Sequence, residues 1–193
     1  MYGLTGSIAT GKSTVAAMLK EKGAVILDAD QISREVVEVG TPGWKQVVEA
    51  FPEAVREDGA LDRKKLGRII FADAEKRRQL EAIIHPLVLD AIKTRGTQLK
   101  QRGQIVFADI PLLYETNSQI WLDGVVVVYV PQAVQLKRLM ERDQLSEKEA
   151  LKRITAQMSI EEKRQLADYV IDNSGTLSET KVQVDRLWYQ IIE

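Results

Sequence analysis

The feature that most constrains the fold is the stretch GSIATGKST, which follows the first few apolar residues of the chain. The stretch fits the pattern G-x-x-x-x-G-K-[ST], whose fixed positions are occupied here by Gly6, Gly11, Lys12 and Ser13. In such a loop, successive backbone N–H groups surround phosphate oxygens, the lysine reaches the β- and γ-phosphates, and the hydroxyl ligates Mg²⁺. The helix that follows adds the positive end of its dipole. The stretch therefore predicts binding of the phosphate tail of a nucleoside triphosphate.

The residues on both sides of the loop supply the context that this motif requires. Tyr2 to Thr5 predict a short strand, and apolar residues after the loop recur at helical spacing until Gly23 ends the pattern. The alternative, a glycine-rich turn with a lysine placed by chance, would need neither a strand before it nor a helix after it. The loop residues predicted to bind the nucleotide are Gly6, Ala9, Thr10, Gly11, Lys12, Ser13 and Thr14.

Composition argues against several other kinds of protein. The 193 residues carry a formal net charge of -1 and have a pI of about 6.0, whereas nucleic-acid-binding domains are usually basic. The absence of cysteine excludes disulfides, thiol catalysis and cysteine–metal sites. No apolar run approaches the length of a membrane span, and the first strand leaves no room for a signal peptide. We therefore expect a cytoplasmic protein that binds neither nucleic acid nor membranes; its oligomeric state stays open, a monomer included.

Short β-branched runs alternate with helical patterns, which predicts an α/β fold with a five-stranded parallel sheet. The run from Val125 to Val130 is almost entirely apolar, as expected of a strand that is covered on both faces. The predicted strands span residues 2–5, 24–28, 104–109, 125–130 and 168–172. Ligands of such sheets bind beyond the carboxyl ends of the strands, which is also where the phosphate loop lies.

Two segments interrupt this alternation. Residues 31–103 are far longer than a simple crossover and predict a set of helices, the last of them divided at Pro86. These helices are expected at 31–39, 43–51, 63–71 and 74–102. Residues 133–166 predict two short helices that start separately, each with its own capping box. Helix-capping residues are predicted at Asp62, Ser146, Ser159 and Thr176.

Basic residues gather in the second of these segments. Arg138 and Arg142 lie four residues apart, so they share one face of a helix. In a protein that binds a triphosphate, two arginines on one face suit a phosphate clamp or lid. Lys148 and Lys152 are better explained as part of a solvated face. The pattern therefore indicates the two arginines as phosphate ligands.

Acidic residues follow two of the predicted strands. AVILDAD ends with Asp28 and Asp30, and residues two apart in an extended chain point to the same side. One acid would suit Mg²⁺ or its waters and the other an acceptor hydroxyl, although the pair could also be solvated caps at a strand end. Asp109 ends a buried strand and could orient a Mg²⁺-bound water instead. The candidate metal ligands are therefore Ser13 with either Asp28 or Asp109.

Six stretches in consecutive order resemble the dephospho-coenzyme A kinase family: GSIATGKST, DADQISREVVEVGTPG, IIHPLV, DIPLLYE, LKRLMERD and ADYVIDNSG. The phosphate loop alone is shared by a vast superfamily, whereas the other stretches together are specific, and the resemblance covers nearly the whole chain. It implies transfer of the γ-phosphoryl group of ATP to the ribose 3′-hydroxyl of dephospho-coenzyme A. It also implies a fold like that of the nucleoside monophosphate kinases. The expected parts are a P-loop core (1–30, 104–137 and 167–193), an acceptor-binding helical insertion (31–103) and a lid (138–166).

The resemblance also implies roles for single residues. Lys12, Asp30 and Arg138 would be catalytic, with Asp30 at the acceptor hydroxyl and the other two at the ATP phosphates. The family often has glycines where this chain has Ser7 and Ala9. This difference affects the freedom of the loop backbone and leaves the fixed positions of the motif intact.

Further residues implied by the resemblance lie outside the phosphate loop. Asn173 and Gly175 follow the last predicted strand, where the adenine of ATP would rest. Tyr114 and Glu115 would lie near the acceptor. His85 is either an acceptor contact or a residue that starts a helix before Pro86.

Two other functions compete with a kinase of this family. A nucleoside monophosphate kinase would accept AMP or a related nucleotide in place of dephospho-coenzyme A. The other is a nucleotide-dependent switch or regulatory module, in which hydrolysis gates a partner. A guanine-nucleotide switch would carry an N-K-x-D base reader after a strand, and neither Asn117 nor Asn173 begins one. The arginine-rich segment and the long insertion favour phosphoryl transfer, because both would exclude water from the γ-phosphate.

Overall fold

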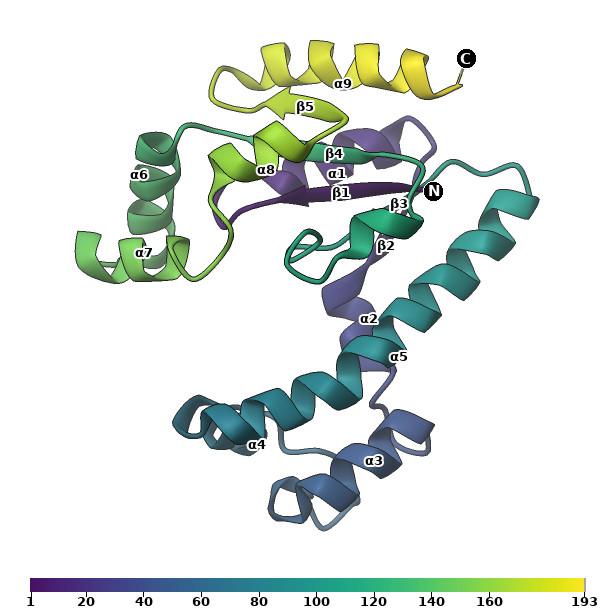
Figure 1. The fold of residues 1–193 in the computed structure, drawn as a ribbon, viewed down its shortest axis with the longest axis vertical. Coiled ribbons are helices and arrows are strands. Elements are labelled where there is room, and N and C mark those ends of the chain that lie inside the picture. The colour runs from purple at the N-terminus through teal and green to yellow at the C-terminus, as the bar shows by residue number, and fades with distance from the viewer. Residues whose placement is uncertain (193) are drawn as a thin grey trace. The chain divides into compact units, whose positions relative to one another are not determined.

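The structure is a computed structural model that describes residues 1–192, and it divides into two compact units. The first unit contains residues 1–27 and the chain from Gly96 onward, and the second contains Asp28–Arg95. The predicted α/β class is confirmed, since the strands form one five-stranded parallel sheet in the order β2–β3–β1–β4–β5 (Figure 1). The strands are β1 (Tyr2–Gly6), β2 (Val25–Asp28), β3 (Val106–Asp109), β4 (Val125–Tyr129) and β5 (Tyr169–Asp172).

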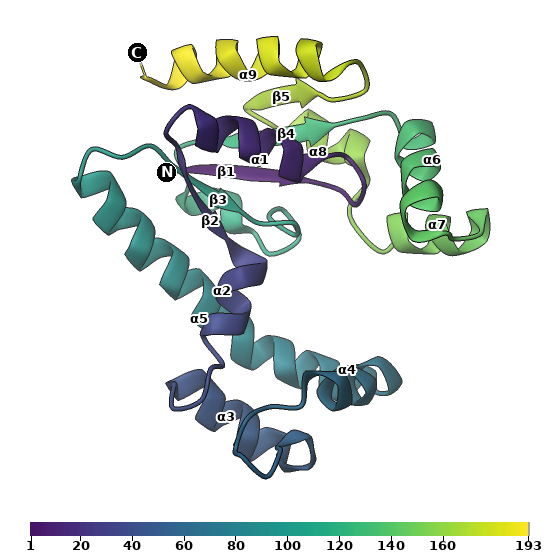
Figure 2. The same ribbon diagram turned by 180° about the vertical axis from the view of Figure 1, so that it is seen from behind.

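The central strands are buried because helices cover both faces of the sheet. Figures 1 and 2 show α1 on one face and α8 on the other. All five residues of β4 are buried, as its apolar run predicts. The helices of this unit are α1 (Lys12–Glu21), α6 (Gln132–Asp143), α7 (Glu147–Ile154), α8 (Ile160–Leu166) and α9 (Leu177–Ile192), with a short 3₁₀ helix η2 (Ser118–Trp121).

The main core of the first unit lies between the sheet and the helices α1 and α9. Apolar residues of α1 and α9 recur at helical spacing, so each helix presents one apolar stripe to the strands. Burying a large aliphatic side chain contributes about 1.5–3 kcal/mol. The fully buried or nearly buried members include Leu4, Val15, Leu19, Phe107, Val126, Val128, Val184 and Leu187.

A smaller apolar cluster forms where α6 and α7 meet the phosphate loop. Leu139 of α6 and Ala150 and Ile154 of α7 are its buried members. The loop residues Ile8 and Ala9 pack against them. The partly buried members from α6 and the turn after it are Leu136, Met140 and Leu145. The helices that carry the basic residues thus share their core with the loop.

The second unit is helical. It contains α2 (Ala29–Glu35), α3 (Pro42–Ala50), the 3₁₀ helix η1 (Pro52–Ala54), α4 (Arg63–Ala72) and most of α5 (Ala74–Gln101), whose last turns from Gly96 belong to the first unit. Its core residues are Val37, Val47, Phe51, Ala54, Leu66 and Leu80. The caps predicted at Asp62, Ser146, Ser159 and Thr176 are confirmed, since each of these side chains accepts a hydrogen bond from a backbone N–H.

The predicted division of the long helix at Pro86 is wrong. α5 runs without a break from Ala74 to Gln101, with Pro86 inside it. A proline within a helix removes one backbone hydrogen bond and costs about 3 kcal/mol. The helix tolerates this cost because Pro86 lies on its exposed side, where water can reach the freed carbonyl, while Leu80 and Val88 anchor the turns on either side in buried positions.

Candidate active site around the phosphate loop

The phosphate loop joins the carboxyl end of β1 to the N-terminus of α1. Two of its residues have positive φ: Ala9 at 62° and Gly11, the N-cap of α1, at 86°. Within residues 1–192, no side chain caps the N-terminus of α1. The first N–H groups of a helix have no partner inside it and carry the positive end of the helix dipole. This helix end therefore provides donors for an anion.

Side chains from two other elements hold the carbonyl groups of the loop. Gln135 Nε2, from α6, donates to the Ile8 carbonyl oxygen at 2.7 Å, and Asn173 Nδ2, after β5, donates to the Thr10 carbonyl oxygen at 2.9 Å. In a trans peptide the next N–H points opposite to the carbonyl. Fixing both carbonyls outward thus turns the following N–H groups toward the inside of the loop, which is the arrangement that a phosphate requires.

Gly11 and Asn173 fit closely against each other. A Cβ atom at position 11 would overlap with the side-chain amide of Asn173, and a φ of 86° strongly favours glycine. The amide oxygen of Asn173 accepts a hydrogen bond from Thr180 Oγ1 at 2.9 Å, so both ends of the side chain are engaged. Arg138 Nη2 donates to the backbone oxygen of Asn173 at 3.0 Å. The structure thus brings the predicted residues Gly11, Arg138 and Asn173 together.

Lys12 and Asp109 meet beside the loop. The Lys12 ammonium group forms an ion pair with the Asp109 carboxylate, which ends β3. Asp109 is 7% exposed, so its charge lies mostly out of water. Ser13, at the second position of α1, has an exposed side chain. Lys12 and Ser13, which follow β1, and Asp109, which ends the adjacent strand β3, were all predicted for phosphate or metal binding.

Asp28 and Asp30 are arranged differently from the prediction. β2 ends at Asp28 and α2 begins at Ala29, so Asp30 lies in the first turn of a helix. Asp28 is the N-cap: its Oδ1 accepts the N–H groups of Asp30 at 2.8 Å and Gln31 at 3.1 Å. The expectation that both carboxylates project from one side of an extended strand is wrong, because the capping bonds turn the chain into a helix. Both aspartates are exposed.

The two arginines predicted as phosphate ligands have different surroundings. Arg138 is half-buried and bonds the chain after β5, as described above. Arg142 is exposed, and its Nε pairs with Asp143 at 2.7 Å. Arg153 of α7 pairs with the same carboxylate at 2.9 Å, and both arginines help to lower the pKa of Asp143. Arg138 is therefore the arginine that the structure connects to the loop.

The other residues predicted around the acceptor and the nucleotide base lie on several elements of the two units. Tyr114 is buried, and burial raises the pKa of its hydroxyl to about 12, with a smaller contribution from Asp168 just before β5. Glu115 pairs with Lys163 at 3.0 Å. His85 is exposed in the middle of α5, in the second unit. Gly175 is exposed in the turn before α9.

The oxygen atoms around the loop fit a magnesium ion held mainly by phosphate and water. The described residues contain no group of three or more His, Cys, Asp or Glu side chains that could hold a metal by themselves. Mg²⁺ usually keeps several waters and takes one or two protein oxygens beside substrate phosphates. The Ser13 hydroxyl and the Asp109 carboxylate supply donors of this type.

Three residues that contact the loop or its neighbours were missed by the sequence analysis as functional candidates. Gln135 is fully buried, Gln157 bonds the N–H of Ile8 at 2.9 Å, and Lys163 has no exposed side-chain area. Gln157 and Lys163 lie about 150 residues from the loop in the chain, so no local spacing could reveal them. A glutamine within the apolar stripe of a predicted helix is the one signal that could have found Gln135.

Sequence relatives agree with this geometry. A model of the dephospho-CoA kinase family matches residues 1–179. A dephospho-CoA kinase of Oceanobacillus iheyensis is 51% identical over 97% of this chain and 95% of its own length. One from Bacillus licheniformis is 50% identical over 97% of this chain and 94% of its own length. The match therefore covers the loop, the helical unit and the chain as far as the start of α9.

Solved structures agree as well. A dephospho-CoA kinase from Campylobacter jejuni has a TM-score of 0.77 at 30% identity, over 98% of this chain and 96% of its own. A shikimate kinase from Acinetobacter baumannii, at 21% identity and a TM-score of 0.52, shares the fold alone. In the part of the chain that the structure describes, no helix has the length and apolar character to cross a membrane. Matched by the family model over most of its length and by relatives at about 50% identity, the chain belongs to the dephospho-CoA kinase family.

Proposed function

We propose that the protein transfers the γ-phosphoryl group of ATP to the ribose 3′-hydroxyl of dephospho-coenzyme A, which gives coenzyme A and ADP. The observation that carries this proposal is the pinned phosphate loop, in which Gln135 and Asn173 hold the carbonyls of Ile8 and Thr10 outward. A loop with its N–H groups already turned inward binds phosphate without first reorganising. The membership of the dephospho-CoA kinase family supplies the acceptor.

The chain's own contribution to the reaction is mainly positioning and charge. The transition state of phosphoryl transfer is loose, with negative charge spread over the equatorial oxygens of the γ-phosphoryl group. Lys12 would exchange its partner Asp109 for phosphate oxygens. Arg138 would add a second positive charge, since it already lies beside Asn173 and the loop. Donors that are fixed before the charge develops lower the barrier most.

Ser13 and Asp109 would hold Mg²⁺ or its waters. We choose Asp109 over Asp28 because Asp109 lies next to Lys12, whereas Oδ1 of Asp28 already accepts two backbone N–H groups as a helix cap. When bound, the metal would neutralise charge on the β- and γ-phosphates. The nucleotide base would contact the chain around Asn173 and Gly175 through backbone groups, because the Asn173 side chain is engaged with the protein.

The acceptor residues are proposed from chemistry and family resemblance. Asp30 would orient the ribose hydroxyl and accept its proton, a role that an exposed carboxylate at a helix N-terminus can fill. His85, also in the second unit, would contact the acceptor. Residues 31–103 would thus be the acceptor-binding part, and residues 138–166 the lid.

One assay tests the function and its competitors. ADP release is measured with dephospho-coenzyme A, with AMP and with no acceptor, and the product is mapped by phosphorus NMR. We expect release only with dephospho-coenzyme A and a new phosphate on the ribose 3′-oxygen. Release with AMP alone would identify a nucleoside monophosphate kinase, and release without an acceptor a hydrolase or switch.

A further inference from the structure

Lys163, on α8, has a fully buried side chain, although it belongs to the basic segment suggested above as a phosphate lid. Its ammonium group donates to the Pro111 carbonyl oxygen at 2.9 Å and pairs with Glu115 Oε1 at 3.0 Å. Burial lowers the pKa of Lys163, and the Glu115 carboxylate opposes this shift. A buried ammonium group needs such partners to replace its lost water. Because the group is enclosed by protein, any effect on a ligand passes through its neighbours.

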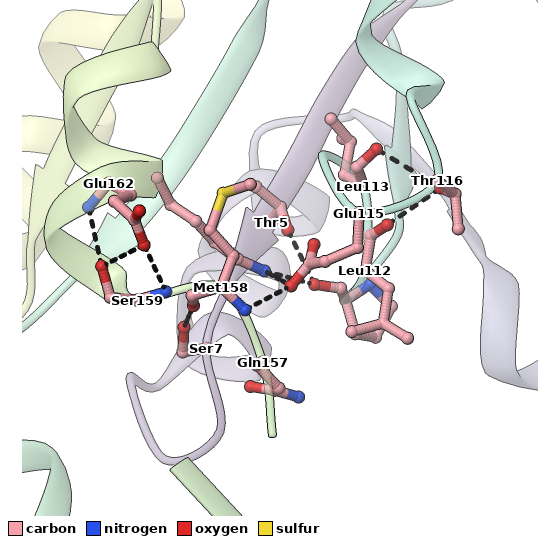
Figure 3. Close-up of polar contacts among 12 residues, drawn as sticks. Thr5, Ser7, Leu112, Leu113, Glu115, Thr116, Gln157, Met158, Ser159 and Glu162 are labelled. Atoms are coloured by element: carbon pink, nitrogen blue, oxygen red, sulfur yellow. Dashed lines mark hydrogen bonds and ion pairs between the residues drawn. The ribbon is translucent and has the colours of Figure 1, made fainter. Parts of the chain in front are cut away.

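The two partners of Lys163 each accept a second hydrogen bond. Glu115 Oε1 also accepts the N–H of Met158, at 3.0 Å, in the connection between α7 and α8 (Figure 3). The Pro111 carbonyl also accepts the hydroxyl of Thr5, at 3.1 Å, near the end of β1. Lys163 therefore joins three segments that are distant in the chain: the end of β1, the turn after β3 and the α7–α8 connection.

The α7–α8 connection in turn holds the phosphate loop. Ser7 Oγ donates to the Met158 carbonyl oxygen at 3.4 Å, and the N–H of Ile8 donates to Gln157 Oε1 at 2.9 Å. Figure 3 shows the bond between Ser7 and Met158. The peptide groups of Ile8 are thus fixed from two sides, by Gln157 at its N–H and by Gln135 at its carbonyl. A displacement of the connection would move the first half of the loop.

We propose that Lys163 is a positioning residue for phosphoryl transfer. Its ion pair with Glu115 holds Gln157 and Met158 against Ser7 and Ile8, and so keeps the phosphate loop in the form that receives the phosphates of ATP. Glu115, which the resemblance places near the acceptor, is part of this network. The effect on turnover rests on the proposed function. The effects on ATP binding and hydrogen exchange rest on the geometry of the loop alone.

The test replaces Lys163 and measures the loop directly. Lys163→Met keeps most of the side-chain volume and removes the ion pair. We expect faster hydrogen exchange in peptides spanning Ser7 to Lys12, weaker ATP binding, and a kcat that is lower by up to about a hundredfold, because small displacements at a reacting site cost this much in rate. Lys148→Met, at an exposed position of α7, is the matched control and should change none of these quantities.

Two further variants separate positioning from simple stability. Gln157→Leu removes the bond to Ile8 at a half-buried side chain, so the fold should survive even where Lys163→Met does not, and it should reproduce the loop effect. Glu115→Gln keeps an oxygen for the Met158 N–H but removes the charge paired with Lys163, so it should restore only part of the ATP affinity lost in Glu115→Ala.

The possible results have distinct meanings. A lower melting temperature with unchanged loop exchange and ATP affinity, in both Lys163→Met and Gln157→Leu, would overturn the proposal. A Glu115→Gln variant with a raised KM for dephospho-coenzyme A alone would also overturn it, since that result would place Glu115 at the acceptor. ATP binding and exchange are measured without an acceptor. A wild-type protein inactive on dephospho-coenzyme A would therefore refute the proposed function and leave this inference standing.

Discussion

The side-chain amide of Gln135 donates a 2.7 Å hydrogen bond to the carbonyl oxygen of Ile8, which is 127 residues away in the chain. The glutamine is fully buried on α6, and its other amide atom, Oε1, has no hydrogen-bond partner within residues 1–192. Burying a polar amide group in the protein costs free energy. The hydrogen bond from Gln135 to the Ile8 carbonyl offsets part of this cost. We interpret Gln135 as a fixed support for the loop.

Gln135→Leu should weaken ATP binding. Leucine fills a similar volume, but it leaves the partly buried Ile8 carbonyl without its donor, which costs up to about 1–3 kcal/mol. We expect that loss to appear as weaker ATP binding by isothermal titration, with a small change in melting temperature. Gln132→Leu, on the exposed side of the same helix, is the control. Equal ATP affinities for the two variants would refute this interpretation of the glutamine.

Lys12→Ala should abolish most of the turnover while the protein stays folded. The lysine charge would meet phosphate oxygens most strongly in the transition state, and loss of one such donor typically costs about 10²–10³-fold in kcat. Steady-state kinetics and circular dichroism are the measurements. Lys20→Ala, an exposed position of the same helix, should retain wild-type turnover. Near-normal turnover of Lys12→Ala would contradict the phosphate-loop interpretation.

Arg138→Ala should lower turnover far more than Arg142→Ala, and Lys148→Ala should have little effect. Arg138 bonds the chain beside the loop, Arg142 is paired with Asp143, and Lys148 is exposed. Loss of one electrostatic donor at a transferring phosphoryl group lowers kcat by about 10²–10³-fold, whereas loss of an exposed charge has little effect. Kinetics at saturating ATP would rank the three variants. Equal losses in all of them would indicate only a general electrostatic field.

Asp30→Asn should reduce turnover and leave ATP affinity unchanged. The amide keeps the shape of the side chain but cannot accept the hydroxyl proton, and general-base help is worth about 10²–10⁴-fold. The lower end is expected, because a loose transition state demands orientation more than proton removal. Asp28→Asn should retain activity and stability, since asparagine caps helices as well as aspartate does. Weak ATP binding with normal turnover at saturation would assign Asp30 to the nucleotide.

Acid should destabilise the protein partly through its capping boxes. The Glu162 carboxylate accepts hydrogen bonds from the Ser159 hydroxyl and N–H, which lower its pKa below 4.5 in the folded state. A group with a depressed folded pKa contributes stability above its unfolded pKa and loses it as pH falls through the folded value. Glu162→Gln should therefore reduce the decline in melting temperature between pH 5 and pH 3. An unchanged decline in Glu162→Gln would contradict this explanation.

Features that depend on residues close together in the chain were predictable from the sequence. The strands lie within two residues of their predicted bounds, and the phosphate loop and the caps follow from spacing and residue type. Pro86 was misjudged because the local cost of a proline is outweighed by the packing of α5 on either side of it. Asp28 was misjudged because its capping bonds turn the chain after β2.

Contacts between distant segments could not be predicted in this way. The pair of Lys163 with Glu115 and the bonds from Gln135 and Gln157 to Ile8 depend on where α6 and α8 pack on the sheet. Each residue type is ordinary at its position in the sequence. Only the fold makes these side chains neighbours of the loop.

The apolar cluster between α6, α7 and the phosphate loop has a consequence for folding cooperativity. Leu139, Ala150 and Ile154 pack against Ile8 and Ala9, so the two helices and the loop share one apolar cluster. Segments that share one core open together as a single unit and exchange their amide hydrogens with the same free energy. The loop and the two helices should thus form one cooperative folding unit, and a peptide containing only α6 and α7 should remain unfolded.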